Sequence, residues 1–353
     1  MGKRVVLIGA GAVGGYVAGH MTRAGHDVTV IDPWPEHVEY MRRTGLELSG
    51  LSPEERFTVP MKALHITEVQ QISKEAPIDI GIVSTKSYDT AWATMLLSQY
   101  LAPDGFICSL QNCINEERIA SIVGWGRTVG CIASLIAAEL TEPGHIQRNV
   151  PLGGDKHTVF RLGEPHGRTT KRVEELADML RAADSAKVTS NLWGERWSKL
   201  VVNAMRNGLS ACTGMSGNER DSNEITRRFS IRIGGEAIRT GQANGYVIED
   251  ILHLPADDWA AAAEGDAAAM QRVEHEIAEG VKRRGDEQRP SMGQDMRKGR
   301  RTEIDQINGF VVEKAAALGR QTPANAALVD VVKRVERGLA KPSIELIANL
   351  HNL

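Results

Sequence analysis

Hydrophobic and polar residues follow two different patterns along this chain, and the change falls near residue 190. In the first half, short apolar runs alternate with segments of helical spacing. The runs predict strands at residues 4–8, 28–31, 78–84, 106–109 and 128–133. The segments between them predict helices at residues 14–24, 35–43, 88–99 and 116–123. This alternation is typical of an α/β fold with a doubly wound, mostly parallel sheet.

The pattern becomes less regular after this alternation and then turns helical. Strands at 144–148 and 159–162 are expected to complete the sheet edge, followed by a helix at 173–183. From about residue 190 to the C-terminus, helical periodicity predominates and hardly any strand signal remains. We therefore expect an N-terminal α/β domain in residues 1–190 and an all-helical C-terminal domain in residues 191–353.

A glycine-rich turn separates the first strand from the first helix. Gly9, Gly11 and Gly14 form a GxGxxG pattern. Gly9 permits a tight turn, Gly11 lets the backbone approach a pyrophosphate, and Gly14 lets helix and strand pack closely. Ala12 and Val13 complete a helix N-terminus that can bind phosphates. A glycine turn in an ordinary α/β protein is the alternative, but the strand–turn–helix context favours a Rossmann-type dinucleotide-binding domain.

Asp32 ends the second predicted strand, eighteen residues after Gly14. A carboxylate there can accept hydrogen bonds from both ribose hydroxyls of the adenosine, and its charge would oppose a 2′-phosphate. We therefore predict NAD(H) in preference to NADP(H). Arg42 and Arg43 lie downstream and complicate this choice, because either could pair with a 2′-phosphate.

A second candidate site lies near the start of the helical half. Lys199, Asn203 and Asn207 stand four residues apart, which places them on one face of a helix. A lysine in a partly desolvated pocket has a lowered pKa and can exchange a proton with a carbonyl or hydroxyl oxygen. The asparagines can orient a substrate. A surface lysine with two capping or interhelical asparagines is the alternative.

A third polar segment spans residues 290–309 and contains Ser291, Asp295, Thr302 and Glu303. Ser291 and Thr302 can each be interpreted as helix caps. Glu303 can be interpreted as a carboxylate that complements a helix dipole.

The glycine turn, the lysine–asparagine helix and the 290–309 segment, in this order, resemble the ketopantoate reductase (2-dehydropantoate 2-reductase) family over nearly the whole chain. The resemblance implies a Rossmann domain, a helical domain that binds substrate and forms dimer contacts, and an active site in the cleft between them. It implies that Lys199 and Glu303 are catalytic. It implies substrate contacts from Asn112, Asn203, Asn207 and Ser291, and cofactor contacts from Lys86 and Asn112.

The chain departs from the family pattern at three places. Cys113 stands where the family usually has glycine, so either the cleft is narrower there or the turn differs. The stretch between Asn207 and Ser291 is longer than in the family and includes an alanine-rich part at 255–289, which we expect to form exposed helices. Asp32 occupies a position where NADP-dependent members favour a basic or neutral residue.

These observations predict an oxidoreductase that transfers a hydride between a nicotinamide cofactor and a small 2-oxo or 2-hydroxy acid. Lys199 would act as general acid in reduction and general base in oxidation. Two alternatives stay open. One is an NAD-dependent dehydrogenase of a different hydroxy acid, of the β-hydroxyacid or opine type. The other is a dinucleotide-binding regulator without catalysis.

Composition narrows the partners of the chain. The net charge of −3 provides no overall field for nucleic acid or an anionic membrane, and no apolar run is long enough to span a bilayer. The cysteines lack metal-ligand spacing, so no metal is expected and reduced, buried thiols in a cytoplasmic protein are predicted. Apolar residues suggest a homodimer, or alternatively the core of the helical domain; they are Phe310, Val311, Val312, Leu328, Val329 and Val332.

Overall fold

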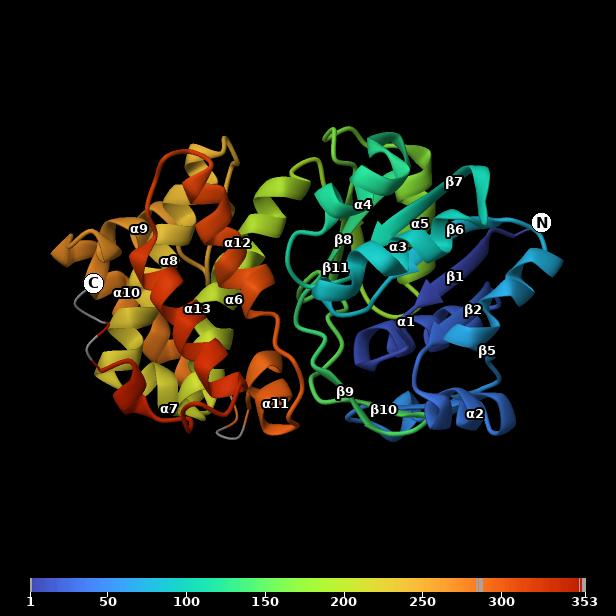
Figure 1. Cartoon of the computed structure of the whole chain (residues 1–353), viewed down its shortest axis with the longest axis horizontal. Helices are drawn as coiled ribbons and strands as arrows, with labels where there is room; N and C mark the ends of the chain where they lie inside the picture. Colours follow the sequence, from blue (N-terminus) through green and yellow to red (C-terminus); the bar gives the residue numbers. More distant parts are fainter. Residues whose placement is uncertain (1, 284, 286–287, 349, 351–353) are drawn as a thin grey trace. The chain divides into compact units, whose positions relative to one another are not determined.

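The chain forms two compact units, Met1–Leu192 and Trp193–Leu353. The computed structural model describes residues 2–283, 285, 288–348 and 350 (Figure 1). The first unit contains the predicted α/β sheet, and the second is built from helices. The predicted fold class is therefore confirmed.

An eight-stranded sheet organises the first unit. Its strands in spatial order are β12 (Ala186–Val188), β11 (Phe160–Gly163), β8 (Thr128–Ala133), β7 (Leu101–Ser109), β6 (Ile78–Val83), β1 (Arg4–Ile8), β2 (Asp27–Asp32) and β5 (Lys62–His65). Neighbouring strands are parallel except β8 and β11, which are antiparallel. The strand order reverses direction at β1 and β6. In open α/β sheets, ligands bind beyond the carboxyl ends of the strands at such a point.

Helices cover both faces of this sheet (Figure 1). They are α1 (Ala12–Arg23), α2 (Pro35–Arg43), α3 (Thr90–Ser98), α4 (Glu116–Val123) and α5 (Lys171–Leu180). Short 3₁₀ helices occur at Pro53–Glu55, Ile66–Lys74, Ser87–Asp89 and Trp125–Arg127. Apolar residues of α1, α2 and α5 join one core cluster, and those of α3 and α4 join a second cluster on the other face. The strands between the two clusters are nearly continuous apolar runs, as burial on both faces requires.

A second, four-stranded sheet corrects one prediction. It contains β4 (Phe57–Val59), β3 (Leu46–Ser49), β10 (His145–Arg148) and β9 (Ala138–Glu142) in this order. The strand expected at 144–148 therefore does not extend the main sheet. It pairs parallel with β3 and antiparallel with β9, and Ile146 packs so tightly on α1 that a Cβ on Gly15 would lie 2.4 Å from its side chain. The strand expected at 159–162 was predicted correctly, since β11 pairs with β8.

A buried ion pair holds the irregular segment between β10 and β11. Arg148 is fully buried and lies 2.6 Å from Asp184. The Asp184 carboxylate also accepts hydrogen bonds from the N–H groups of Gly153 at 3.0 Å and Ser185 at 2.6 Å. Burial alone would raise the pKa of Asp184, but these donors and the Arg148 charge hold it below its usual value. A buried pair of this kind keeps its partners in place because losing one partner leaves an unpaired buried charge.

The second unit is an assembly of helices. They are α6 (Leu192–Thr213), α7 (Gly217–Ser222), α8 (Glu224–Ala243), α9 (Ala256–Ala263), α10 (Ala267–Arg283), α11 (Ser291–Arg297), α12 (Ile304–Ala316) and α13 (Pro323–Glu336), with a 3₁₀ helix at Ile344–Leu346. Within the described part of this unit, the sole β feature is a bridge between Ile251 and Leu254. None of the helices in the described chain combines the length and the apolar character that a membrane span requires.

The structure decides between two alternatives for the apolar residues of this unit and corrects one expectation about its surface. Phe310, Val311, Leu328 and Val332 are buried, so the alternative that they form the core of the helical unit is confirmed, and they present no exposed face for a dimer. The alanine-rich part is also not simply solvated. Helix α9 buries Trp259 completely, and α10 buries three residues of its inner face. Both helices are amphipathic, and the alanines allow α9 to approach α8 closely.

Burial of His20 predicts a pH-dependent loss of stability. The His20 ring lies between Tyr16 in a tilted contact and Phe57 in an edge-to-face contact, with ring centroids 4.4 and 5.0 Å away. Burial lowers the pKa of His20 from 6.5 to about 4. The unfolded chain therefore binds a proton below pH 6.5 that the folded chain does not, so stability falls as the pH drops towards 4. This term amounts to about 2 kcal/mol near pH 5. In urea unfolding, the loss of stability between about pH 7 and pH 5 should be smaller in His20→Gln than in the wild type by roughly this amount. An equal loss in both proteins would contradict the burial of a neutral imidazole.

Candidate functional site

The glycine turn has the geometry that a dinucleotide-binding site requires. Gly9 has a φ of 95°, and a Cβ there would lie 2.8 Å from backbone atoms of Ser84 and Thr85. A Cβ on Gly14 would lie 2.2 Å from the Gly9 carbonyl oxygen. A Cβ on Gly11 would meet no atom of the described chain within 4 Å. The turn is therefore closed at Gly9 and Gly14 and open at Gly11, which fits a phosphate approaching the N-terminus of α1.

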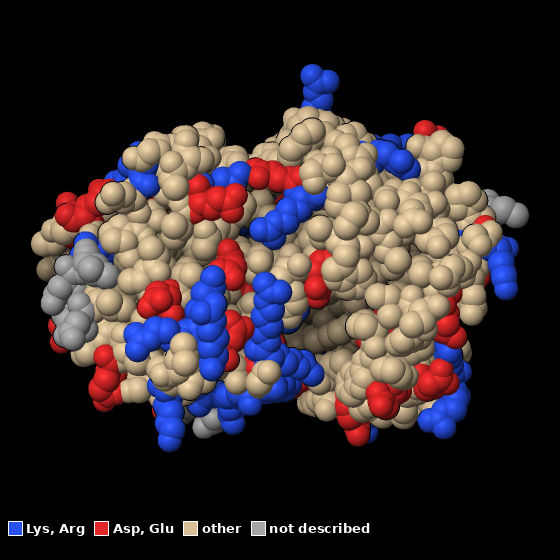
Figure 2. All heavy atoms as spheres, viewed as in Figure 1, with Lys and Arg blue, Asp and Glu red and all other residues tan. Residues whose placement is uncertain are grey.

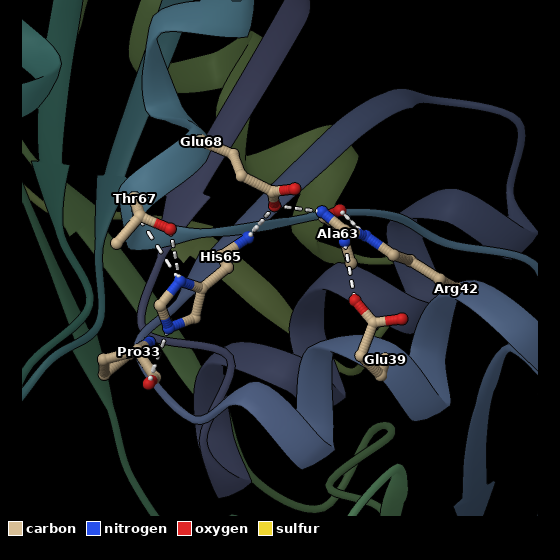
Figure 3. Close-up of polar contacts among 7 residues, drawn as sticks. All are labelled: Pro33, Glu39, Arg42, Ala63, His65, Thr67 and Glu68. Atoms are coloured by element: carbon tan, nitrogen blue, oxygen red, sulfur yellow. Dashed lines mark hydrogen bonds and ion pairs between the residues drawn. The ribbon is translucent and has the colours of Figure 1, made fainter.

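Asp32 connects the end of β2 to this turn. Its Oδ2 accepts a hydrogen bond from the Ala10 N–H at 2.8 Å, and its Oδ1 accepts one from the Trp34 N–H at 2.9 Å. Burial raises the pKa of Asp32, and these bonds oppose the rise. Each carboxylate oxygen has two lone pairs, so both oxygens can accept a further bond from a ligand hydroxyl. His65 lies opposite Asp32 in the β2–β5 register and donates from Nε2 to the Pro33 carbonyl at 3.1 Å (Figure 3).

Arg42 is bound to side chains of its own unit. Its guanidinium pairs with Glu39 at 2.7 Å and with Glu68, and its Nε donates to the Ala63 carbonyl at 2.9 Å (Figure 3). Arg43 is exposed and forms no ion pair or side-chain hydrogen bond with a described residue. Of the two arginines that complicate the cofactor choice, Arg43 is therefore the one whose charge is not already neutralised.

Lys86 and Asn112 lie in the loops that follow β6 and β7, at the carboxyl edge of the sheet. A polar network that the sequence analysis missed joins these loops. Gln111 donates from Nε2 to the Thr85 carbonyl at 2.9 Å, and Ser87 Oγ donates to the Asn112 carbonyl at 3.0 Å. The network brings the two loops side by side. The sequence signal that could have pointed to this network is a glutamine directly before Asn112, just after an apolar strand.

Cys113 adopts a backbone conformation that favours glycine. Its φ is 67°, in the left-handed region, which costs a residue with a side chain about 1 kcal/mol or more. The Cys113 side chain is buried. The prediction of buried, unbridged thiols is confirmed for all four cysteines, Cys108, Cys113, Cys131 and Cys212.

Contacts on one side fix the rotation of α6. Trp197 is fully buried and donates from Nε1 to the Ala237 carbonyl of α8 at 2.8 Å. Asn308 of α12 donates from Nδ2 to the Ala204 carbonyl at 3.2 Å. A Cβ on Gly208 would lie 2.8 Å from Leu328 of α13. These positions lie on one stripe of α6, which therefore packs against α8, α12 and α13.

Lys199, Asn203 and Asn207 follow one another on a different stripe of α6. At 100° per residue, Lys199 lies on the side of the helix opposite Trp197, and each step of four residues turns the stripe by about 40° towards the packed side. Burial follows this drift. Lys199 and Asn203 are half-buried, whereas Asn207 is only 5% exposed.

Ser291 and Glu303 start the two helices that follow the alanine-rich part. Helix α11 packs on α6, since a Cβ on Gly293 would lie 2.6 Å from Ser210 Oγ. The capping interpretations were wrong. Pro290 is the N-cap of α11 and Ser291 its first helical residue, while the N-cap of α12 is Glu303, so Thr302 lies outside the helix. Glu303 forms no side-chain capping bond to α12 and is buried.

The four predicted substrate-binding side chains share a property. None of their amide or hydroxyl groups forms a hydrogen bond with a residue that the structure describes; they are Asn112, Asn203, Asn207 and Ser291. Asn207 is buried as a residue, but its amide atoms keep some accessible area and are not among the fully buried unpaired atoms. The amide of Asn207 is thus a group that a bound ligand can reach and satisfy. Lys86, Lys199 and Glu303 each have a protein partner.

Exposed cations gather at the C-terminal end of α11. Figure 2 shows Lys and Arg side chains concentrated on the visible face of the helical unit over α11 and α13. The segment after the start of α11 contributes four exposed cations, Arg297, Lys298, Arg300 and Arg301. A local positive potential of this kind attracts small anions, although the net charge of the chain is negative.

Family models match both units. The model for "Ketopantoate reductase PanE/ApbA" matches residues 5–159, and the model for its C-terminal part matches residues 191–336. The 2-dehydropantoate 2-reductase of Archaeoglobus fulgidus is 29% identical over 338 residues, covering 96% of this chain and 99% of the relative. The enzyme of that name from Pyrococcus horikoshii is 29% identical over 335 residues, covering 94% of this chain and 97% of the relative.

Solved structures agree with this relationship. A PanE/ApbA family ketopantoate reductase from Ralstonia eutropha superimposes with a TM-score of 0.76 at 27% identity, covering 95% of this chain and 99% of the other. D-mandelate dehydrogenase, in a structure with NADH and anilino(oxo)acetate, has a TM-score of 0.74 at 22% identity, covering 95% and 99%, and so shares the fold. Because the family models together span most of both units, the chain belongs to the ketopantoate reductase family of oxidoreductases.

Proposed function

We propose that the chain reduces the keto group of a small 2-oxo acid, with ketopantoate as the first substrate to test. The observation that carries the proposal is the stripe of α6 on which Asn203 and Asn207 have no hydrogen-bond partner among the described residues, although Asn207 is almost fully buried. Lys199 lies on the same stripe. Family membership supplies the reaction class, and the stripe supplies groups that fit it.

In this proposal Lys199 gives a proton to the carbonyl oxygen during reduction and takes one from the hydroxyl during oxidation. A bound reduced nicotinamide supplies the hydride. Asn112, Asn203, Asn207 and Ser291 hold the substrate by donating to its carboxylate or hydroxyl oxygens. Glu303 orients Lys199 or the substrate hydroxyl, since its carboxylate does not cap α12. The cations at the C-terminal end of α11 favour a substrate with a negative charge.

We also propose that the glycine turn binds NAD(H) in preference to NADP(H). Asp32 places a carboxylate next to the turn, and Arg42 is neutralised by Glu39 and Glu68. The open space at Gly11 supports pyrophosphate binding there. Lys86 and Asn112 would contact the cofactor from the neighbouring loops.

A second candidate function is NAD-dependent oxidation of a different 2-hydroxy acid. Asp32 favours it, because ketopantoate reductases commonly use NADP(H). The fold also occurs in D-mandelate dehydrogenase with NADH, so the fold does not exclude this substrate class. Turnover with a panel of 2-hydroxy acids and ketopantoate distinguishes the two functions. A homodimer stays a prediction. The apolar residues on which it was based are buried in the core of the helical unit and do not support it.

Replacing the proposed proton donor should separate catalysis from binding. In Lys199→Met, kcat should fall by roughly 100-fold or more, because general acid–base catalysis contributes about that factor. The affinity for NADH, measured by fluorescence titration, should stay within about twofold. Lys171→Met, which removes an exposed lysine of α5, serves as the matched control and should retain full activity. Near-normal kcat in Lys199→Met would refute the assigned role.

The glycine turn can be tested without disturbing the fold. Gly11 has a φ of −65°, which alanine adopts readily, and a Cβ there meets no described atom. Gly11→Ala should therefore unfold at the wild-type urea concentration but bind NADH about tenfold more weakly, because the methyl group occupies the approach of the pyrophosphate. Gly126→Ala, at another glycine with open space, should change neither property. Unchanged NADH affinity in Gly11→Ala would place the cofactor elsewhere.

Cofactor preference should depend on the charge of Asp32. The wild type should bind NADH about tenfold more tightly than NADPH, as expected for a partly screened repulsion of 1–2 kcal/mol. In Asp32→Ser this ratio should fall towards one. The ratio is the informative quantity, because losing the Ala10 and Trp34 hydrogen bonds lowers the affinity for both cofactors. Preference of the wild type for NADPH would contradict the proposal and direct attention to Arg43.

A further inference from the structure

An open polar cavity lies on the helical unit, and none of its lining residues belongs to α6 or α11. Its volume is about 340 Å³, and it is lined by α8, α9 and the loop that leads into α13. This volume is within the usual range for small-ligand sites. Arg232, Arg239 and Arg320 line it together with Glu236 and Glu264.

Three of the charged groups in the cavity already have partners. Arg239 forms a bidentate pair with Glu264, at 2.6 and 2.8 Å. Glu236 accepts hydrogen bonds from the N–H groups of Ala324 and Asn325, both at 2.9 Å, so it satisfies the N-terminus of α13. Its negative charge remains, and the three arginines and two glutamates of the lining leave an excess of positive charge.

Two cations of the lining form no ion pair with a described residue, although Arg320 lies close enough to Glu264 to help lower its pKa. Arg232 and Arg320 form neither a hydrogen bond nor an ion pair through their side chains with any residue in the described part of the chain. Arg232 lies on the same stripe of α8 as Glu236 and Arg239, four and seven residues earlier, so it faces the same cavity. Thr322 is a further lining residue, and its buried hydroxyl has no partner among the described residues.

We propose that this cavity binds a phosphate-bearing small molecule through Arg232 and Arg320. A planar guanidinium presents paired N–H donors that match phosphate oxygens, and two such groups balance a dianion. The surrounding acidic groups are held by Arg239 and by the start of α13, so they stay fixed while the ligand binds. The site is independent of the proposed reduction, because it uses no residue assigned to substrate or cofactor.

Calorimetric titration of the full chain with inorganic pyrophosphate tests this site. The double variant Arg232→Gln/Arg320→Gln should bind pyrophosphate about 100-fold more weakly than the wild type, because each of the two lost charge-assisted contacts contributes about tenfold in affinity. Arg228→Gln is the matched control. It removes an arginine one turn away on α8 that is paired with Glu224 at 3.0 Å and does not line the cavity, so the affinity should stay within about twofold. Because glycine turns also bind phosphate, the comparison between variants isolates the contribution of this cavity.

Equal affinity of the wild type and the double variant would overturn the proposal, as would the absence of binding by the wild type at millimolar pyrophosphate. Citrate binding about tenfold more tightly than pyrophosphate would show that the ligand class is wrong. Should the double variant fail to fold, Arg320→Gln alone, on the exposed loop before α13, should still weaken binding. Unchanged NADH affinity in each folded variant shows that the nucleotide turn is intact.

Discussion

The burial of one side of α6 is the constraint on which the candidate site depends. Trp197, Ala204 and Gly208 pack against three other helices, and two hydrogen bonds fix the rotation of α6 about its axis. Turning the helix would expose Trp197, a loss of several kcal/mol of apolar burial. The direction of Lys199 is therefore a consequence of core packing. The gradual turn of the stripe also explains why Asn207 is buried, although its amide has no hydrogen-bond partner among the described residues: helix geometry carries this position towards the core, and the residue there is polar.

Local patterns in the sequence predicted the fold well where short-range geometry decides the structure. The turn at Gly9 and Gly14 brings these residues against each other and against the residues that follow β6. These close contacts leave no room for a side chain, so only glycine fits. Helix α2 was predicted with its observed ends because Pro35 marks its start. The second sheet was not predicted, because β10 finds its partner β3 about a hundred residues earlier in the chain. No local pattern carries such a register.

The site was predicted only in part, for a related reason. The spacing of Lys199, Asn203 and Asn207 is a local pattern, and it identifies a stripe. Whether the polar side chains of such a stripe form hydrogen bonds within the protein depends on their tertiary neighbours. The same holds for Ser291, whose position as first helical residue rather than helix cap is not visible in the local sequence. The loop network at Gln111 was missed because a single glutamine after a strand has many ordinary explanations.

The adenosine end of the turn combines structural and recognition roles in one carboxylate. Asp32 holds Ala10 and Trp34, so it cannot be exchanged without loosening the turn. Its negative charge is placed there by the fold, and a 2′-phosphate would need a cation to offset it. Arg42 cannot supply one without giving up its ion pairs with Glu39 and Glu68. The proposed preference for NAD(H) therefore rests on the electrostatics of the folded unit rather than on the number of arginines in the sequence.

A chain of hydrogen bonds connects Glu236, which lines the cavity with Arg232 and Arg320, to the backbone of α6. Its Oε2 accepts from Asn325 Nδ2 at 2.8 Å, and Asn325 Oδ1 accepts from Asn308 Nδ2 at 2.9 Å. Asn308 Nδ2 also donates to the Ala204 carbonyl, directly after Asn203. Both neighbours of Asn308 Nδ2 are acceptors, so its amide cannot flip, and its buried Oδ1 is left without a partner among the described residues. The two hydrogen bonds that Asn308 Nδ2 donates therefore outweigh the cost of leaving its Oδ1 unpaired. Glu236 therefore cannot move without breaking a hydrogen bond that leads to the helix carrying Lys199.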